Sequence, residues 1–129
     1  LLTENVKIIA QFDEVAEMIT LKSYLYSIFY NLILNSIKYR RPDVPPVIEI
    51  KSSRRKDEIE LIFKDNGRGI DLEKNGSQVF GLYKRFHREI EGKGVGLFII
   101  KTQVEALGGK ISVKSEVNKG TEFKIIFAN

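Results

Sequence analysis

Three polar side chains spaced along one predicted helix are the first candidates for chemistry in this sequence. Asn31, Asn35 and Lys38 are separated by four and then three residues, so a helix places them on one stripe. The helix is predicted from Leu21 to about Arg40, because this segment contains neither Gly nor Pro and prolines follow it. An Asn oxygen can ligate magnesium beside phosphate oxygens, and a Lys on the next turn would meet the same phosphates. Buried amides also satisfy backbone groups, so the helix alone leaves ligand binding and a structural role open.

Two glycine-rich segments follow this helix. Asp65-Asn66-Gly67-Arg68-Gly69-Ile70 comes after a predicted strand, and its glycines would let the backbone pass close to a ligand. Taken alone, this hexapeptide is better explained as a turn with a capping Asp. Gly92-Lys93-Gly94-Val95-Gly96-Leu97 opens a second predicted helix, whose free amides and positive dipole end would attract an anion. This second segment lacks the spacing of a dinucleotide-binding fold, and the sequence contains no P-loop.

The elements that must position these residues are strands with few helices. Helices are predicted over residues 21–40, 95–107 and, within an irregular glycine-rich stretch, about 79–86. Strands are predicted over residues 6–12, 18–20, 47–52 and 58–64, the last two joined by a polar turn over 53–57, and a hairpin pairs 110–116 with 121–127. We therefore expect an α+β fold: a two-layer sandwich with a mixed, mostly antiparallel sheet of about five strands and about three helices on one face. The irregular stretch over 65–96 is typical of a lid or binding loop.

Size and composition favour one domain over residues 1–129, with 43% hydrophobic and 29% charged residues. The absence of cysteine excludes disulfides and thiolate metal sites. No apolar run reaches the roughly 18 residues that cross a bilayer, and no signal peptide is expected at the start. The net charge is +4, which is compatible with a nucleic-acid surface, with solvated surface charge or with attraction of a polyphosphate. Charge alone does not decide among these.

The order of the motifs resembles the Bergerat-type ATP-binding fold, the superfamily of histidine kinases, gyrase, mismatch-repair and heat-shock ATPases. A polar helix stripe, Asp-x-Gly-x-Gly, a Phe segment, Gly-x-Gly-x-Gly-Leu and Gly-Thr-x-Phe follow one another over nearly the whole chain. The resemblance implies ATP and magnesium as cofactors. It implies that Asn35 is the magnesium ligand, that Asn31 and Lys38 neighbour the phosphates, and that Tyr39 forms a wall near the nucleotide.

The resemblance also implies contacts to the base and to the phosphates. Asp65 would hydrogen-bond the adenine amino group, Thr121 would help to hold adenine through water, and Arg85 would contact phosphate from the lid. The remaining implied positions shape the pocket and the phosphate loop: Gly67, Gly69, Ile70, Phe80, Gly92, Lys93, Gly94, Val95, Gly96, Leu97 and Gly120. Lys93 stands where Thr or Ser is common, so the phosphate contact there is expected to differ.

The branch of the superfamily is indicated by the residue four positions before Asn35. Hydrolytic and serine-kinase relatives place there a Glu that acts as general base, whereas this chain has Asn31, which cannot take a proton at neutral pH. A histidine acceptor is often already neutral and nucleophilic, so Asn31 favours phosphotransfer to histidine. Two alternatives remain open at this point: an ATPase or serine kinase of the same fold, and a non-catalytic binding module with a vestigial nucleotide site.

The phosphoacceptor is expected outside this domain. His87 is the only histidine, and it falls in the predicted lid rather than on a helical hairpin. The resemblance therefore implies a separate helical dimerisation and phosphoacceptor domain of the same protein, a response regulator downstream and no nucleic-acid partner. We expect the isolated domain to be a cytoplasmic monomer and the full-length protein to be a homodimer, and membrane anchoring of the full-length protein stays open.

Overall fold

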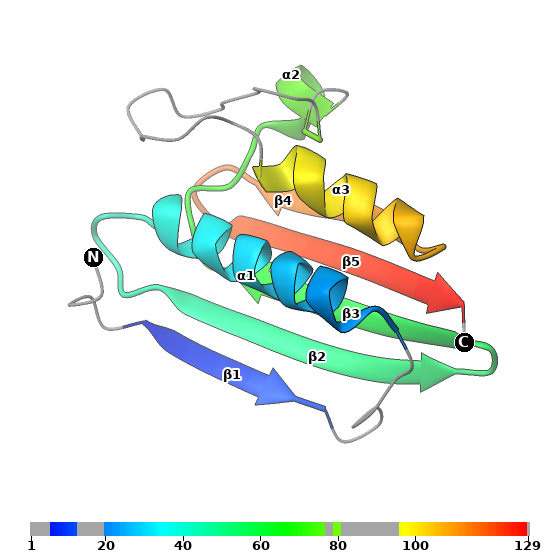
Figure 1. Ribbon diagram of the computed structural model, residues 1–129. Coiled ribbons are helices and arrows are strands. Elements are labelled where there is room, and N and C mark those ends of the chain that lie inside the picture. The colour runs from blue at the N-terminus through cyan, green and yellow to red at the C-terminus, as the bar shows by residue number, and fades with distance from the viewer. Residues whose placement is uncertain (1–5, 13–19, 77–78, 81–95, 129) are drawn as a thin grey trace.

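The computed structural model consists of one five-stranded sheet with two long helices packed against it (Figure 1). The structure describes residues 6–12, 20–76, 79–80 and 96–128. The strands are β1 (Lys7–Gln11), β2 (Val47–Arg55), β3 (Glu58–Asp65), β4 (Lys110–Glu116) and β5 (Gly120–Ala128). The helices are α1 (Lys22–Lys38), α2 (Leu72–Asn75) and α3 (Gly96–Ala106).

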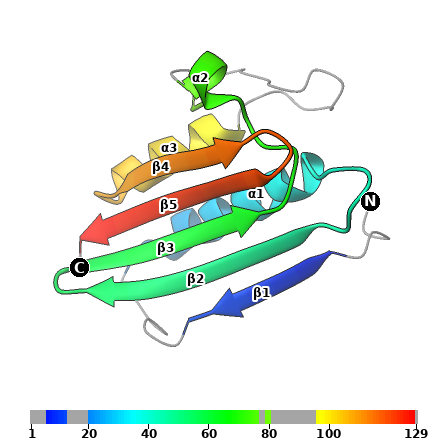
Figure 2. The ribbon, with the colours of Figure 1, turned by 180° about the vertical axis from the view of Figure 1, so that it is seen from behind.

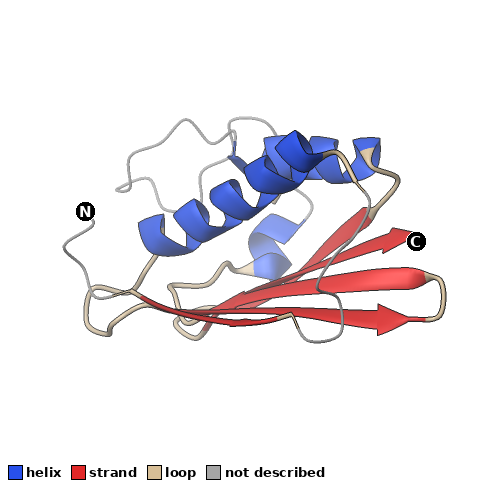
Figure 3. Ribbon diagram, turned by 60° about the horizontal axis from the view of Figure 1, so that its bottom comes forward, coloured by secondary structure: helices blue, strands red, loops and turns tan. Residues whose placement is uncertain are grey.

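The sheet has the order β1-β2-β3-β5-β4, with β1 parallel to β2 and the other neighbours antiparallel. Both long helices lie on the same face of the sheet, as the side view makes clear (Figure 3). The view from behind shows the opposite face uncovered by any drawn helix (Figure 2). The predicted two-layer α+β fold with a mixed, mostly antiparallel sheet is therefore confirmed.

The core lies between the two layers and is built by alternation along the strands, because successive side chains of a strand point to opposite faces. On β5 every second residue from Thr121 to Phe127 is buried. The buried side chains that face one another across the two layers are mostly branched or aromatic: Ile28, Leu32, Ile48, Ile50, Leu61, Phe63, Ile100, Val104, Phe123, Ile125 and Phe127. Burial of each contributes roughly 1.5–3 kcal/mol, which fixes the helices on the sheet.

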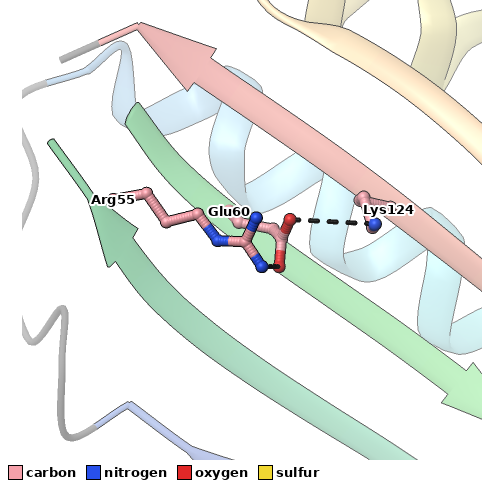
Figure 4. A network of polar contacts seen from close by, with 3 residues as sticks. All are labelled: Arg55, Glu60 and Lys124. Atoms are coloured by element: carbon pink, nitrogen blue, oxygen red, sulfur yellow. Dashed lines mark ion pairs between the residues drawn. The ribbon is translucent and has the colours of Figure 1, made fainter. Parts of the chain in front are cut away.

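The uncovered face of the sheet carries charged side chains that pair across strands. The carboxylate of Glu60 on β3 lies between Arg55 of β2 and Lys124 of β5, at 3.9 and 3.8 Å (Figure 4). The side chain of Glu60 is only 8% exposed, because these two long side chains lie beside it. Such pairing lets this face meet water without a second layer of helices.

Two of the expected elements differ from the observed ones, and two others fall mostly outside the described residues. The expected polar turn over 53–57 is wrong, since β2 and β3 stay paired to Arg55 and Glu58 and only Lys56 and Asp57 remain in the turn. The short helix α2 lies in a stretch expected to be irregular. Of the helix expected near 79–86, residues 79 and 80 form a turn and the rest lies outside the described residues. The strand expected at 18–20 is likewise mostly outside them, and Thr20 lies in a bend.

The outward side of α1 carries exposed aromatic side chains. Ile28 and Leu32 are its buried residues, whereas Tyr26 and Tyr30 are 63% and 56% exposed. The reason is geometric: the single sheet covers only one side of the helix, and α3 covers part of another. Within the part of the chain that the structure describes, no helix combines the length and apolar character needed to span a membrane.

Two glycines bring the backbone after β3 into direct contact with the β4–β5 hairpin. Gly69 has φ +74°, and a side chain there would overlap the carbonyl group of Glu116. Gly120 has φ +134°, and a side chain there would overlap the carbonyl group of Asp65. Both positions therefore need glycine for its backbone conformation and for the close approach.

The close approach can be separated from backbone strain by two alanine substitutions. Gly108, after α3, has φ +77° like Gly69, but nothing lies within 4 Å of a side chain placed there. Gly69→Ala is expected to lower the free energy of unfolding by about 1–3 kcal/mol more than Gly108→Ala. Both substitutions strain the backbone, but only the methyl group at position 69 would also overlap the backbone of Glu116. Urea denaturation of both variants measures the difference, and equal losses would contradict the contact.

Candidate functional site

The carboxylate of Asp65, at the end of β3, is held by donors from three different segments. Its Oδ1 accepts the backbone N–H of Gly67 at 2.9 Å and that of Thr121 at 3.2 Å. Its Oδ2 accepts the hydroxyl of Ser36, from α1, at 2.9 Å. An ionised carboxylate has about four acceptor positions, so one position on Oδ2 remains for a ligand.

Burial raises the pKa of Asp65 above its ordinary value of 3.8. Desolvation is the largest cause, and the hydrogen bonds from Gly67, Ser36 and Thr121 oppose it by stabilising the charged form. A carboxylate that is desolvated and still has an open acceptor position binds an N–H donor more strongly than one in water.

A second polar group lies beside Asp65, at the end of the β4–β5 hairpin. The hydroxyls of Ser115 and Thr121 are 2.8 Å apart, on residues that face each other across the two strands. The Ser115 hydroxyl also accepts the backbone N–H of Ile70 at 2.7 Å, which attaches the segment after β3 to the hairpin. Thr121 is 8% exposed, and its backbone N–H donates to Asp65, so it lies directly beside that carboxylate.

Polar contacts attach the segment that follows Asp65 to the residues after α1. The Arg41 guanidinium donates to the carbonyl of Asn66 at 3.0 Å and to that of Asn118 at 2.9 Å. The backbone N–H of Arg68 donates to the carbonyl of Tyr39 at 2.9 Å. A side chain at Gly67 would come within 2.7 Å of the same carbonyl oxygen, so this glycine is needed for the close approach. The base of the site is therefore rigidly connected to the end of α1.

The predicted polar stripe of α1 is present, and its members differ in their partners. The amide nitrogen of Asn31 donates to the Ser27 carbonyl at 2.8 Å, so its Oδ1 is the atom directed toward the start of α3. The side-chain amide of Asn35 makes no hydrogen bond to any residue that the structure describes, which leaves its oxygen for a ligand. The Lys38 ammonium lies 6.0 Å from the centre of the Tyr39 ring.

The predicted phosphate loop is described only at its end. Gly96 begins α3, and a side chain there would lie 3.8 Å from Oδ1 of Asn31. Leu97 is 8% exposed and belongs to the core, so its role in this structure is to hold the start of α3 on the sheet. Four predicted phosphate-loop positions and the predicted lid contact lie outside the described residues: Gly92, Lys93, Gly94, Val95 and Arg85.

Phe80 and Ile70, both predicted to contact the nucleotide, pack on the core in this structure. The Phe80 ring meets the Phe123 ring edge-on at 6.2 Å, and the Lys101 ammonium lies 5.8 Å from its centre. Ile70 is 9% exposed and belongs to the same core cluster. Their predicted contact with a nucleotide stays a prediction.

The structure therefore gathers the described candidate residues around the ends of α1 and β3 and the start of α3. Asp65 offers an acceptor at the end of β3, and α1 contributes the Asn35 amide and the Lys38 ammonium near its own end, while Asn31 of α1 lies near the start of α3. A planar base with an amino group suits the acceptor, and a phosphate chain with a divalent cation suits the α1 side chains and the start of α3. Among the described residues, no group of three or more acidic or His side chains is placed to hold a metal ion.

A one-sided mixed sheet with this arrangement of motifs defines the class of Bergerat-type ATP-binding domains. The family model described as histidine kinase-, DNA gyrase B-, and HSP90-like ATPase matches residues 20–128, and the chain belongs to this family. The resemblance that the sequence motifs indicated is thereby confirmed.

Curated relatives include a histidine kinase, a phytochrome and a sensor protein. The chain is 38% identical over 91 residues to the methanogenesis regulatory histidine kinase FilI of Methanothrix harundinacea, covering 70% of this chain and 10% of FilI. It is 38% identical over 101 residues to cyanobacterial phytochrome A of a Nostoc species, covering 77% of this chain and 13% of that protein. It is 40% identical over 99 residues to the sensor protein SrrB of Staphylococcus aureus, covering 74% and 16%. The chain thus spans only a small part of the length of these relatives.

Solved structures share the fold. The mycobacterial sensor histidine kinase MprB aligns with a TM-score of 0.78 at 21% identity, covering 96% of this chain and 84% of that one. Full-length ShkA in complex with AMPPNP aligns with a TM-score of 0.79 at 20% identity, covering 96% of this chain and 26% of that one. At these identities the likeness establishes the fold alone.

Sequence reasoning missed Ser36, Ser115 and Arg41. Ser36 could have been found, because it follows Leu25, Phe29 and Leu32 at helical spacing and so puts a hydroxyl on the side of α1 that faces the sheet. Ser115 likewise takes the inward position after Ile111 and Val113 in an alternating strand. Arg41 gave no local signal, since its partners are 25 and 77 residues away.

The raised pKa of Asp65 predicts a specific dependence of stability on pH. Above pH 3.8, and up to the raised pKa, the folded protein keeps a proton that the unfolded chain has lost. The free energy of unfolding contributed by Asp65 is therefore largest at low pH and decreases as pH rises through this window. Asp65→Asn removes the titration while its oxygen can still accept from Gly67 and Thr121.

The quantity to measure is the free energy of unfolding of the wild type minus that of Asp65→Asn, by urea denaturation from about pH 3.5 to about pH 7. We expect this difference to fall with rising pH. A difference that rises over the same range would mean that the hydrogen bonds, not burial, dominate the pKa of Asp65.

Proposed function

We propose that this chain, residues 1–129, is a single ATP-binding catalytic domain of a sensor histidine kinase. It binds ATP with magnesium and transfers the γ-phosphoryl group to a histidine on a separate helical domain of the same protein. In this reaction the terminal P–O bond of ATP breaks toward ADP as a P–N bond forms to the imidazole nitrogen. Family membership supports nucleotide binding, and the histidine kinases among the relatives support the choice of acceptor.

The observation that carries the proposal is the remaining acceptor position on Oδ2 of Asp65. The adenine amino group is an N–H donor, and guanine presents a carbonyl oxygen at the same place on the ring, which the carboxylate would repel. Thr121 stands next to this carboxylate and supplies a second polar contact for the base. These polar groups therefore suit adenine better than guanine.

The phosphate end is served by α1 and by the start of α3. Asn35 would hold magnesium through its amide oxygen, Lys38 would meet the phosphates as a point charge, and Arg85 and the glycine segment before α3 would contact them. When bound, magnesium neutralises phosphate charge and orients the γ-phosphoryl group. The amide of Asn35, which has no partner among the described residues, fits this role.

Asn31 argues against hydrolysis as the main activity. Its nitrogen is committed to the Ser27 carbonyl, so its oxygen faces α3, yet an amide oxygen does not take a proton at neutral pH. A water nucleophile would lack a base at this position, whereas a neutral imidazole needs none. Transfer to histidine is thus the reaction that these side chains serve best.

The partners follow from this reaction. The acceptor histidine would lie on a helical dimerisation domain, the phosphoryl group would pass to a response regulator, and the full-length protein would be a homodimer. We place the domain in the cytoplasm, where ATP is available, and expect it to be monomeric when isolated and to bind no nucleic acid.

Removal of the proposed magnesium ligand tests the reaction. With a helical domain that carries an acceptor histidine supplied, Asn35→Ala is expected to reduce phosphotransfer from γ-labelled ATP by about 100-fold or more. Asn35→Asp keeps one oxygen for the cation and is expected to retain part of the activity at raised magnesium concentration.

The assignment of Asn35 would be refuted by unchanged transfer in Asn35→Ala. Steady release of inorganic phosphate by the isolated wild-type chain, without transfer to histidine, would instead favour an ATPase of the same fold. A circular dichroism melt of each variant checks that the loss is not one of folding.

A further inference from the structure

The Ser115 hydroxyl stands at the centre of three polar contacts behind the base end of the site. It accepts the backbone N–H of Ile70 at 2.7 Å. It lies 2.9 Å from the carbonyl oxygen of Gly120 and 2.8 Å from the hydroxyl oxygen of Thr121. A hydroxyl has one proton and two acceptor positions, and Ile70 occupies one of the acceptor positions.

The number of protons decides the direction of these contacts. Gly120 offers a carbonyl oxygen, which can only accept, so the Ser115 proton must point to it for the 2.9 Å contact to be a hydrogen bond. The contact with Thr121 is then satisfied only if Thr121 donates its own proton to Ser115. If Ser115 donated to Thr121 instead, the Ser115 and Gly120 oxygens would lie 2.9 Å apart without a proton between them. Two such acceptors facing each other at a half-buried position cost free energy.

The position of the Thr121 proton decides whether its hydroxyl can donate a hydrogen bond to a ligand. With its proton directed to Ser115, the Thr121 hydroxyl offers acceptor positions only. The neighbouring Asp65 has one acceptor position left on Oδ2, after Ser36, Gly67 and Thr121 have taken the others. Both polar groups at this end of the site therefore accept hydrogen bonds.

We propose that Ser115 is a positioning residue for base selectivity: it draws the Thr121 proton away from the site, so that the site rejects purines that carry an oxygen in place of the amino group. This inference rests on the proposed function, since it concerns the base end of the same nucleotide site. Adenine carries an amino group, an N–H donor, at the ring position where inosine carries a carbonyl oxygen, to which Asp65 cannot donate. Thr121 could donate to that oxygen only if Ser115 released its proton.

The test compares binding of non-hydrolysable analogues of ATP and ITP by isothermal titration calorimetry. In Ser115→Ala the Thr121 proton is free to turn into the site, so the ratio of the ITP Kd to the ATP Kd is expected to fall about three- to tenfold. Ser115→Cys, which keeps the size of the side chain but is a weak donor and acceptor, is expected to change the ratio in the same direction. Ser115→Thr restores a hydroxyl and is expected to keep the wild-type ratio.

Thr121→Val separates this role from a merely structural one. If Ser115 acts through the Thr121 hydroxyl, Ser115→Ala changes the ratio of the ITP Kd to the ATP Kd in the wild type but not in Thr121→Val, which lacks that hydroxyl. If Ser115→Ala instead loosens the packing of the hairpin, the ratio changes in the wild type and in Thr121→Val alike. ATP-selective binding by the wild type with an unaltered ratio in Ser115→Ala and Ser115→Cys would overturn this inference alone. Absence of ATP binding by the wild type would overturn the proposed function and the inference with it.

Discussion

The carboxylate of Asp65 is the constraint on which the rest of the site depends. It is buried enough for desolvation to raise its pKa, and it is held in place by Ser36, Gly67 and Thr121. These donors come from α1, from the segment after β3 and from β5. The carboxylate can be satisfied only when these three parts are packed together, so this arrangement forms only when the fold itself forms.

The two ends of the site are built in different ways. At the base end, which contains Asp65 and Thr121, the close contacts at Gly69 and Gly120 pack the segment after β3 against the β4–β5 hairpin. Arg41 donates hydrogen bonds to both of these segments, so the polar groups of this end are already oriented. At the phosphate end, the candidate ligands are the side chains of Asn35 and Lys38, and Asn35 has no hydrogen-bond partner among the described residues. If the proposed nucleotide binds here, the oriented polar groups of the base end would reduce the ordering cost of its binding.

Local sequence patterns predicted the fold because each element carries its own signal. The alternation in β4 and β5 and the Gly-free helix from residue 22 to 38 can both be seen in consecutive residues. The ends of β2 could not be found in this way, since pairing with β3 rather than the polar composition of residues 53–55 decides where the strand ends.

The site was only partly predictable for the same reason. Asp65 and the glycines belong to a motif and were found, although the proposed contacts of these residues with a nucleotide stay predictions. Ser36, Ser115 and Arg41 act through partners far along the chain, and their types are common on any surface. What the sequence does contain is a polar residue at an inward position of α1 and of β4, and such a position indicates a buried partner even before that partner is known.

The most direct test of the account is the selectivity of the isolated chain for adenine and its dependence on Asp65. Calorimetric titration with a non-hydrolysable ATP analogue, with the corresponding GTP analogue as control, should give binding of the adenine nucleotide only. Asp65→Asn should weaken that binding about 10- to 100-fold, because a hydrogen bond to a charged group is lost. Equal affinity of the wild type and Asp65→Asn for the ATP analogue would contradict the central role assigned to this carboxylate.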